Sequence, residues 1–197
     1  MIQLIGPGGA GKTTTGFALA NRLGVQFVDL DAMFIAAHGD VGEFIEAKGY
    51  GAYASQNVET YRGIARTLDE STVVALSSGF MIYPHSVHPD YPDIRQAIVS
   101  DIRTVLLLPS LDLELCVSET VRRQLLRPFA RTAQREEQVI RTRFHAYVNL
   151  SVRRIVTCVP VCAVVRAIMD LLDENHPASL STASARMPPP SLRPKDA

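Results

Sequence analysis

The chain has 197 residues, enough for one domain with a full core, and its apolar share of 47% and charged share of 20% are ordinary for a globular protein. Its formal net charge is zero and its arginines are scattered, which argues against a nucleic acid or an anionic membrane as the main partner. No apolar run reaches the roughly 18 residues of a membrane span, and the start, MIQLIGPGG, lacks the basic region of a signal peptide, so we expect a cytoplasmic protein.

The first predicted elements are a short strand, a glycine-rich loop and a helix. MIQLI runs into GPGGAGKTTTG, and the helical pattern of FALANRLG ends at Gly24. The loop matches G-x-x-x-x-G-K-[ST], whose backbone N–H groups surround phosphate oxygens, whose lysine reaches the β- and γ-phosphates and whose hydroxyl ligates Mg²⁺. The sequence therefore predicts a site for a nucleoside triphosphate and Mg²⁺ that uses Gly6, Gly8, Gly9, Ala10, Gly11, Lys12, Thr13 and Thr14.

Two aspartates stand in the second predicted strand, VQFVDLD, over residues 25–31. In an extended chain, the side chains of residues two apart point to the same face of the sheet. We therefore expect the side chains of Asp29 and Asp31 to lie on the same face at the end of the strand. An ionised carboxylate is costly to bury, so these two are expected to bind a ligand or an ion. The alternative is that they only cap the next helix.

The remaining elements alternate between helices and strands. Residues 32–70 are predicted to be helical with interruptions at Gly39, Gly42, Gly49 and Gly51. Strands are predicted at 71–78, 103–109 and 154–158, and helices at 94–102, 112–126, 135–150 and 161–175. This order predicts an α/β fold, with a mostly five-stranded parallel sheet covered by helices on both faces.

The composition changes near residue 176 to a segment rich in Ser, Ala and Pro. We expect one domain over 1–175 and a disordered tail over 176–197, since the tail cannot bury enough apolar surface to order itself. Cys116, Cys158 and Cys162 fit neither a zinc site nor a redox pair and are expected to be reduced core residues.

The third predicted strand ends in Ser77 and Ser78, where many proteins with this loop carry a magnesium-binding aspartate. Asp29, at the end of the neighbouring strand, is the natural replacement, acting on the ion through water. The guanine-reading pattern N/T-K-x-D of GTPases does not occur in the sequence.

The order of the motifs resembles the shikimate kinase family. GPGGAGKT is followed by Asp29-Leu30-Asp31, then LSSGF after the third strand, LLRPFA in the region of a lid, and an R-x-x-x-Y pattern in RFHAY. These motifs cover the chain from residue 1 to about residue 172, and each later motif is short. The resemblance implies a three-layer P-loop kinase fold with a mobile lid over about 112–135, acting on ATP and a small carboxylated polyol, as a monomer.

Roles follow from this resemblance residue by residue. Lys12, Asp31 and Arg127 would be catalytic: Asp31 would orient the attacking hydroxyl and take its proton, and Arg127 would close over the transferred phosphate. Asp31, Gly79 and Arg143 would bind the acceptor, with Arg143 pairing with its carboxylate. Arg122 and Arg123 are candidates for ATP contacts, with Arg123 preferred; an exposed helix face is the alternative for these arginines.

The sequence departs from the family in two places. Laying KGYGAYASQN over the family pattern puts Tyr53 on an aromatic position, Ala54 on a carboxylate-binding arginine and Asn57 on its acidic partner. After the third strand, Phe80 and Met81 replace glycines and are expected to place bulk where a small ring would bind. The segment 82–93 is longer than usual, and His85, His88, Asp90 and Tyr91 are candidates for a substrate rim.

These departures keep two alternatives open. One is a P-loop kinase for another small metabolite, such as a sugar acid or a nucleotide. The other is a nucleotide-binding regulatory module without turnover.

Overall fold

A parallel sheet forms the centre of the protein in the computed structural model, which describes residues 1–126 and 132–173. Within these residues five strands follow the order β2-β3-β1-β4-β5, and every neighbouring pair is parallel. The strands are β1 Ile2–Ile5, β2 Phe27–Asp29, β3 Val73–Ala75, β4 Thr104–Leu108 and β5 Arg153–Val156. The predicted five-stranded α/β architecture is confirmed.

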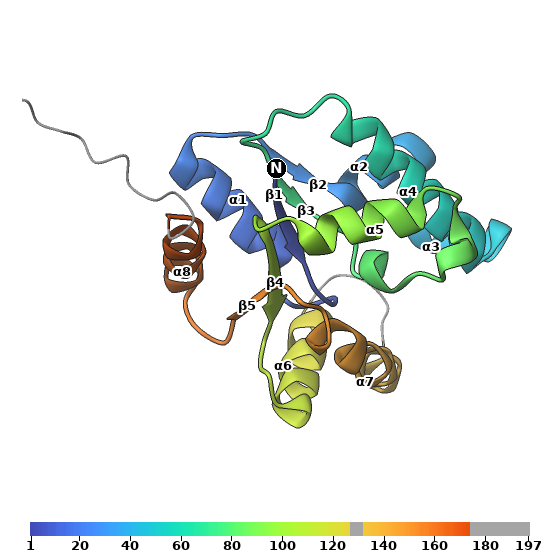
Figure 1. Cartoon of the computed structure of the whole chain (residues 1–197). Coiled ribbons are helices and arrows are strands. Elements are labelled where there is room, and N and C mark those ends of the chain that lie inside the picture. Colours follow the sequence, from blue (N-terminus) through green and yellow to red (C-terminus); the bar gives the residue numbers. More distant parts are fainter. Residues whose placement is uncertain (127–131, 174–197) are drawn as a thin grey trace, which may run out of the picture.

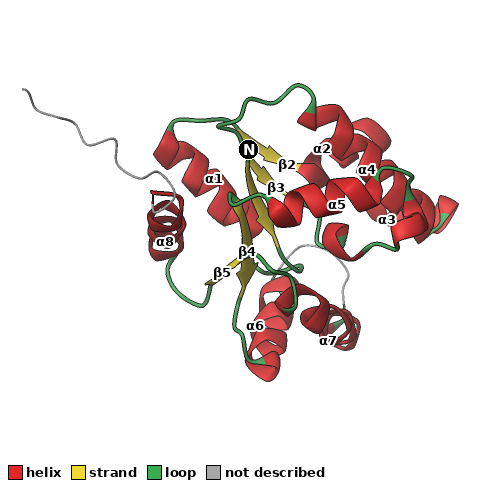
Figure 2. Cartoon of the chain, in the orientation of Figure 1, coloured by secondary structure: helices red, strands yellow, loops and turns green. Residues whose placement is uncertain are grey.

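Helices cover both faces of the sheet (Figure 1 and Figure 2). The helices α1 and α8 lie on one side, and α2, α3, α4 and α5 lie on the other (Figure 1). The helices α6 and α7 pack on each other beyond the carboxyl ends of the strands. Their bounds are α1 Lys12–Leu23, α2 Leu30–His38, α3 Val41–Lys48, α4 Tyr50–Ala65, α5 Tyr91–Ser100, α6 Leu113–Leu125, α7 Ala133–Val148 and α8 Val161–Asp173.

Alternating strand residues feed two separate cores. Leu4, Val105 and Leu107 pack with α1 and α8, whereas Ile5, Leu106 and Leu108 belong to the cluster on the opposite face. This period of two is the expected consequence of the pleat in strands that are buried on both faces. The carboxyl ends of all five strands therefore meet at one edge, where ligands bind in open α/β sheets.

The chain between β2 and β3 forms three helices, so the predicted interruptions are confirmed at Gly39 and Gly49 but are wrong at Gly42 and Gly51, which lie within α3 and α4. The helices α2 and α3 end at Gly39 and Gly49, which adopt φ angles of 83° and 85°. The second strand is shorter than predicted, because it ends at Asp29 and Leu30 already begins α2. Asp31 thus lies in the first turn of a helix, so the interpretation as a strand residue is confirmed for Asp29 and wrong for Asp31.

Phe80 and Met81 do not obstruct the pocket edge. They form the short 3-10 turn η1 (Phe80–Ile82), which turns both side chains inward, and their exposed fractions are 0% and 1%. The Phe80 ring packs against Tyr61, Tyr83 and Tyr91, with ring centroids 5.1–6.0 Å apart. The expectation that these two residues place bulk where a small ring would bind is wrong.

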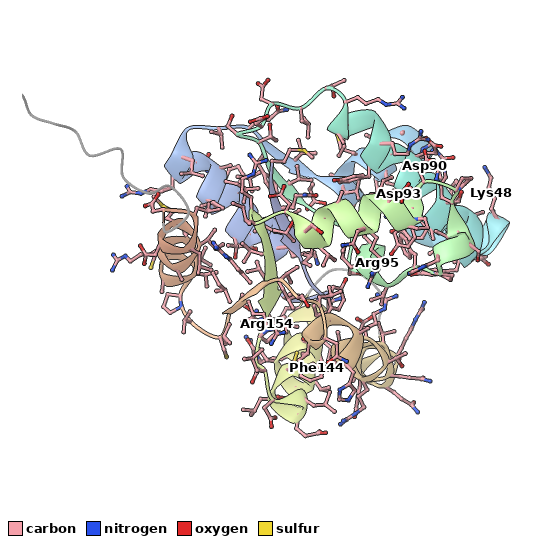
Figure 3. The ribbon with its side chains drawn as sticks, viewed as in Figure 1. Lys48, Asp90, Asp93, Arg95, Phe144 and Arg154 are labelled. Atoms are coloured by element: carbon pink, nitrogen blue, oxygen red, sulfur yellow. The ribbon has the colours of Figure 1, made fainter. Side chains whose placement is uncertain are left out.

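The segment 82–93 packs against α4 instead of lining the pocket. It contains η2 (His85–Val87), and His88 Nε2 lies 2.7 Å from Glu59 Oε1. Arg62 Nη2 lies 2.7 Å from Asp90 Oδ2, and Asp90 is labelled in Figure 3. Tyr91 is fully buried and its hydroxyl donates to Phe80 O. The prediction of a substrate rim from this segment is wrong.

Two remaining expectations concern the cysteines and the membrane. Cys116 is buried, but Cys158 and Cys162 are exposed thiols, so the core assignment is wrong for the latter pair. No helix in 1–126 or 132–173 is long and apolar enough to span a membrane. The predicted tail and Arg127 in the predicted lid lie outside the described residues.

Candidate active site

The glycine-rich loop joins β1 to α1 at the carboxyl edge of the sheet. Gly6 has φ 142°, and a Cβ atom there would lie 2.3 Å from Leu107 O of β4, so only glycine fits this turn. Gly11 caps α1 without any side-chain hydrogen bond to the first turn. The N–H groups of that turn, with the positive end of the helix dipole, are therefore available to an anion.

Lys12 lies across this loop. Its side chain is largely buried, and Nζ donates to the carbonyl oxygens of Gly6 at 2.7 Å and Pro7 at 3.0 Å. The ammonium group is thereby held over the concave side of the loop, where a phosphate chain would meet both the backbone N–H groups and this charge. Lys12 therefore lies on the phosphate loop, where the motif places its lysine.

Thr13 and Asp29 come into direct contact from two different elements. The Thr13 hydroxyl donates to Asp29 Oδ2 at 2.6 Å. The other oxygen, Asp29 Oδ1, accepts from the backbone N–H groups of Asp31 at 3.0 Å and Ala32 at 3.3 Å, so it caps α2. One carboxylate therefore caps the next helix, as the alternative for Asp29 predicted, and also contacts the loop threonine.

The oxygens of Thr13 and Asp29 suit a hard divalent cation. Mg²⁺ prefers oxygen ligands and keeps several waters, and is bound through one or two protein groups plus substrate phosphates. A hydroxyl and a carboxylate beside a phosphate loop fit this requirement. Within 1–126 and 132–173, no group of three or more His, Cys, Asp or Glu side chains could hold a metal by itself.

A polar pocket brings seven of the predicted residues together, and Gly6, Gly79, Arg123 and Arg143 are not among those that line it. Asp31 reaches it from the first turn of α2, so both carboxylates face the same space although only Asp29 is in a strand. The side chain of Ala10 is instead buried in the core, and Thr14 is exposed. The pocket is lined by Gly8, Gly9, Gly11, Lys12, Thr13, Asp29, Asp31, Leu76, Ser78 and Gln124.

Arg123 secures the phosphate loop from α6. Its Nη1 donates to Gly9 O at 3.1 Å and to the Thr157 hydroxyl at 3.0 Å, and its Nη2 donates to Thr157 O at 2.8 Å. Hydrogen bonds from Arg122 and from Arg123 lower the pKa of Glu119 to about 2. Arg123 therefore lies beside the predicted nucleotide site, whereas Arg122 is on the exposed face.

Gln124 is a pocket residue that sequence reasoning missed. It is buried, its Nε2 donates to Glu136 Oε2 at 3.1 Å, and a Cβ atom on Gly8 would lie 2.4 Å from that Nε2. The side chain thus packs directly on the phosphate loop. Nothing in the sequence around a glutamine on an amphipathic helix indicates such a position.

The two residues of the R-x-x-x-Y pattern, Arg143 and Tyr147, both lie on α7 and contact the same residue. Arg143 and Tyr147 are four residues apart, which places them on one helix face. The Tyr147 hydroxyl donates to Ser78 O at 2.8 Å, and Arg143 Nη1 approaches the same oxygen at 3.4 Å. Ser78 also lines the phosphate pocket. These hydrogen bonds therefore fix α7 to the turn after β3, at the edge of that pocket.

The position where the resemblance implies a charged pair holds neutral groups. Ala54 and Asn57 are both fully buried on α4, and Asn57 Nδ2 donates to the Tyr83 hydroxyl at 2.8 Å. Burial, followed by the charge of Asp31, raises the pKa of Tyr53 to about 12. Tyr61 and Arg62, the next aromatic–arginine pair on α4, do not replace that pair, because their partners are Gln3, Glu59 and Asp90.

The family model for shikimate kinase matches residues 8–170 of the chain. A shikimate kinase 2 from Enterobacter sp. (strain 638) is 34% identical over 86 residues, which are 43% of this chain and 48% of that protein. The chain thus spans about half the length of the curated relatives it matches.

Solved structures share the fold at low identity. Shikimate kinase from Acinetobacter baumannii, solved in complex with shikimate, matches with a TM-score of 0.63 and 21% identity over 88% of this chain and 93% of that one. A gluconokinase from Sinorhizobium meliloti 1021 matches with a TM-score of 0.56 and 17% identity over 87% of this chain and 90% of that one. The fold alone therefore does not select the acceptor.

Proposed function

Because the chain belongs to the shikimate kinase family, we propose that it transfers the γ-phosphoryl group of ATP to a hydroxyl group of shikimate. The product is shikimate 3-phosphate, on the route to chorismate and the aromatic amino acids. The observation that carries this proposal is the position of Asp31, which lines the same pocket as Lys12 and Thr13 of the phosphate loop. A carboxylate at that place suits an acceptor hydroxyl better than a purely structural role.

The phosphate half of the site would hold ATP. Phosphoryl transfer depends mainly on positioning and on stabilising charge, and both are supplied here by the N–H groups of the loop and by Lys12. Arg123 keeps the loop in place through Gly9 O. Thr13 and Asp29 would hold Mg²⁺, which when bound neutralises charge on the phosphate oxygens.

The acceptor half would orient the attacking hydroxyl. Asp31 would accept a hydrogen bond from that hydroxyl and take its proton as the bond to phosphorus forms. Gly79 and Arg143 lie on the far side of Ser78, where Arg143 would pair with the acceptor carboxylate. Arg127, which lies outside the described residues, would close over the transferred phosphate.

One specific observation favours a second candidate, a kinase of the same type for another small metabolite. The neutral environment of Ala54, Asn57 and Tyr83 supplies fewer charges for a carboxylate than the family resemblance implies. A sugar acid or a nucleotide would then be the acceptor. The third alternative, a nucleotide-binding regulatory module, predicts ATP binding without stimulation by any acceptor.

A coupled assay of ADP release separates these three functions. We expect shikimate to stimulate ADP release well above the rate with ATP and Mg²⁺ alone, and mass spectrometry should show one added phosphate. Gluconate and deoxyadenosine serve as the competing acceptors. A folded protein that ignores shikimate but uses another acceptor would contradict the assignment, and one that binds ATP without using any acceptor would favour the regulatory alternative.

Two finer predictions accompany this function. We expect the enzyme to be a monomer and to act in the cytoplasm. Size-exclusion chromatography with light scattering and cell fractionation test them.

A further inference from the structure

Arg143 is a part-buried cation whose hydrogen-bond contacts within residues 1–126 and 132–173 are all with neutral oxygens. Its Nη1 lies 3.4 Å from Ser78 O and 3.5 Å from the Ser78 hydroxyl, and its Nη2 lies 3.3 Å from the Tyr50 hydroxyl. Other arginines of the described chain form close ion pairs: Arg141 with Glu114 at 2.6 Å, and Arg62 with Glu59 at 2.6 Å. A guanidinium held only by long bonds to neutral groups retains its capacity for an anion.

Tyr50 stands beside that guanidinium, at the first residue of α4. A Cβ atom built on Gly79 would lie 2.6 Å from the Tyr50 hydroxyl oxygen and 3.6 Å from Arg143 Nη2. The hydroxyl and the guanidinium therefore cover the same small stretch of backbone, the turn that the family resemblance places against the acceptor. The absence of a side chain on Gly79 is what lets them approach it.

The Tyr50 hydroxyl is oriented as a donor. Its oxygen accepts from Arg143 Nη2, so its own hydrogen points away from the arginine. Burial raises the pKa of Tyr50, while the positive charge of Arg143 opposes that shift. The phenol therefore keeps its proton at neutral pH and presents an O–H beside an N–H of the guanidinium. Two adjacent donors of this kind match the two oxygens of a carboxylate.

The position of Tyr50 also explains how the site tolerates Ala54. The two residues are four apart on α4 and share one helix face. A long side chain at position 54 would lean towards the helix N-terminus, over the turn that contains Tyr50. Ala54 is fully buried and small, so it leaves Tyr50 as the polar group that extends from this face towards Arg143.

The geometry points to Tyr50 as a specificity-determining residue, whose hydroxyl binds the acceptor carboxylate together with Arg143. This inference rests on the proposed function, since it concerns the acceptor of that reaction. Recognition in this chain would thus use one cation and one neutral donor on the carboxylate.

The test is the variant Tyr50→Phe, measured by steady-state kinetics with shikimate and with its uncharged carboxamide as acceptors. We expect the KM for shikimate to rise about 10-fold, the lower end of the range for a hydrogen bond to a charged group. The kcat and the KM for ATP should not change, and the KM for the carboxamide should rise much less. Tyr61→Phe is the matched control, because its hydroxyl donates to Gln3 Oε1 in the core.

Each outcome decides the inference. An unchanged KM for shikimate in Tyr50→Phe, or equal rises for shikimate and the carboxamide, would overturn it. If the unmodified enzyme ignores shikimate but uses another acceptor, the proposed function fails while the inference is judged on that acceptor, with and without its carboxylate. Use of acceptors that carry no carboxylate, or of none at all, would overturn the role of Tyr50 as well.

Discussion

The two halves of the proposed site are built in different ways. The phosphate half is built around one continuous segment, the loop before α1, whose glycines are required by backbone contacts such as that of Gly6 with Leu107 O. The proposed acceptor half is assembled from α4, the turn at Ser78 and Gly79, and α7, which are far apart in the sequence and meet through side chains such as Tyr50 and Arg143. A site held by backbone geometry tolerates few substitutions, whereas one held by side chains can be rebuilt by exchanging partners.

The charge balance differs between the halves in the same way. Lys12 and Asp29 are charged groups on the phosphate side of the proposed site, and Asp31 lies where its two halves meet. The acceptor side relies on Tyr50, Tyr53 and neutral groups on α4, with Arg143 as its cation. Substitutions on the phosphate side should therefore abolish turnover, and those on the acceptor side should change affinity, specificity or stability.

Replacing Asp31 should have the largest effect, because it lies where the halves meet. In Asp31→Asn we expect kcat to fall about 10²–10⁴-fold, the range for loss of a general base, with little change in the KM for ATP. Asp40→Asn is the control, since Asp40 caps α3 through the N–H groups of Gly42 and Glu43. Unchanged turnover in Asp31→Asn would place the acceptor hydroxyl elsewhere.

Lys12 tests whether the phosphate half acts as one unit. In Lys12→Met we expect kcat/KM for ATP to fall about 10²–10³-fold, as for loss of one preorganised charge donor. Lys48→Met is the matched control, because Lys48 Nζ lies 4.6 Å from the centre of the Phe44 ring, and Figure 3 shows Lys48 at the outer end of α3. Thermal unfolding of both variants checks that the fold persists. Equal losses of activity in the two would mean that the loop lysine has no special role.

Ala54 tests whether the acceptor half retains room for the missing charge. Ala54 is fully buried, so Ala54→Arg should lower the free energy of unfolding by about 3 kcal/mol or more, the cost of an unpaired buried charge. Adding Asn57→Asp should restore part of that loss, because the two sites are one helical turn apart and can pair. Urea denaturation measures both.

The opposite result for Ala54→Arg would change the view of the acceptor half. Suppose that the single variant is as stable as the original and binds shikimate more tightly. The protein would then have kept the space for an arginine side chain at position 54, and no other group would have taken over its role. The contrast between a fixed half and a rebuilt half would then disappear.

The sequence predicted the phosphate half well because its chemistry depends on local spacing. Lys12, Thr13 and the preceding glycines share one turn, and a motif of eight residues describes them. Asp29 was also identified, although its simultaneous role as the cap of α2 depends on β2 ending two residues earlier than predicted. The error had little effect, since the helix start also turns Asp31 into the pocket.

The acceptor half could be predicted only in part. The resemblance proposed Gly79 and Arg143 for this half, but nothing in the sequence proposed Tyr50, because the residues that it contacts come from distant parts of the chain. Phe80 and Met81 were misjudged for a related reason. Sequence order gives their position after β3, but only the 3-10 turn η1 determines that they face the core.

The smallest expected effect is the contribution of Tyr53 to the pH dependence of stability. This contribution reports how strongly the acceptor half is buried. Its pKa is raised to about 12, so the folded state favours the neutral phenol. Below the ordinary pKa of about 10 both states keep the proton, and stability does not depend on this group. Between pH 10 and 12 only the unfolded state loses it, so the free energy of unfolding should fall by about 1.4 kcal/mol per pH unit.

Tyr53→Phe should remove that contribution, leaving a shallower decline of stability above pH 10 in urea denaturation. Tyr61→Phe is the control, because burial also raises the pKa of Tyr61 to about 12 at a site outside the pocket. For Tyr53 the charge of Asp31 adds to burial, so Asp31→Asn should reduce the effect of Tyr53→Phe but not that of Tyr61→Phe. An equal response of both tyrosines to Asp31→Asn, or none, would mean that the carboxylate at the centre of the site does not influence the α4 wall.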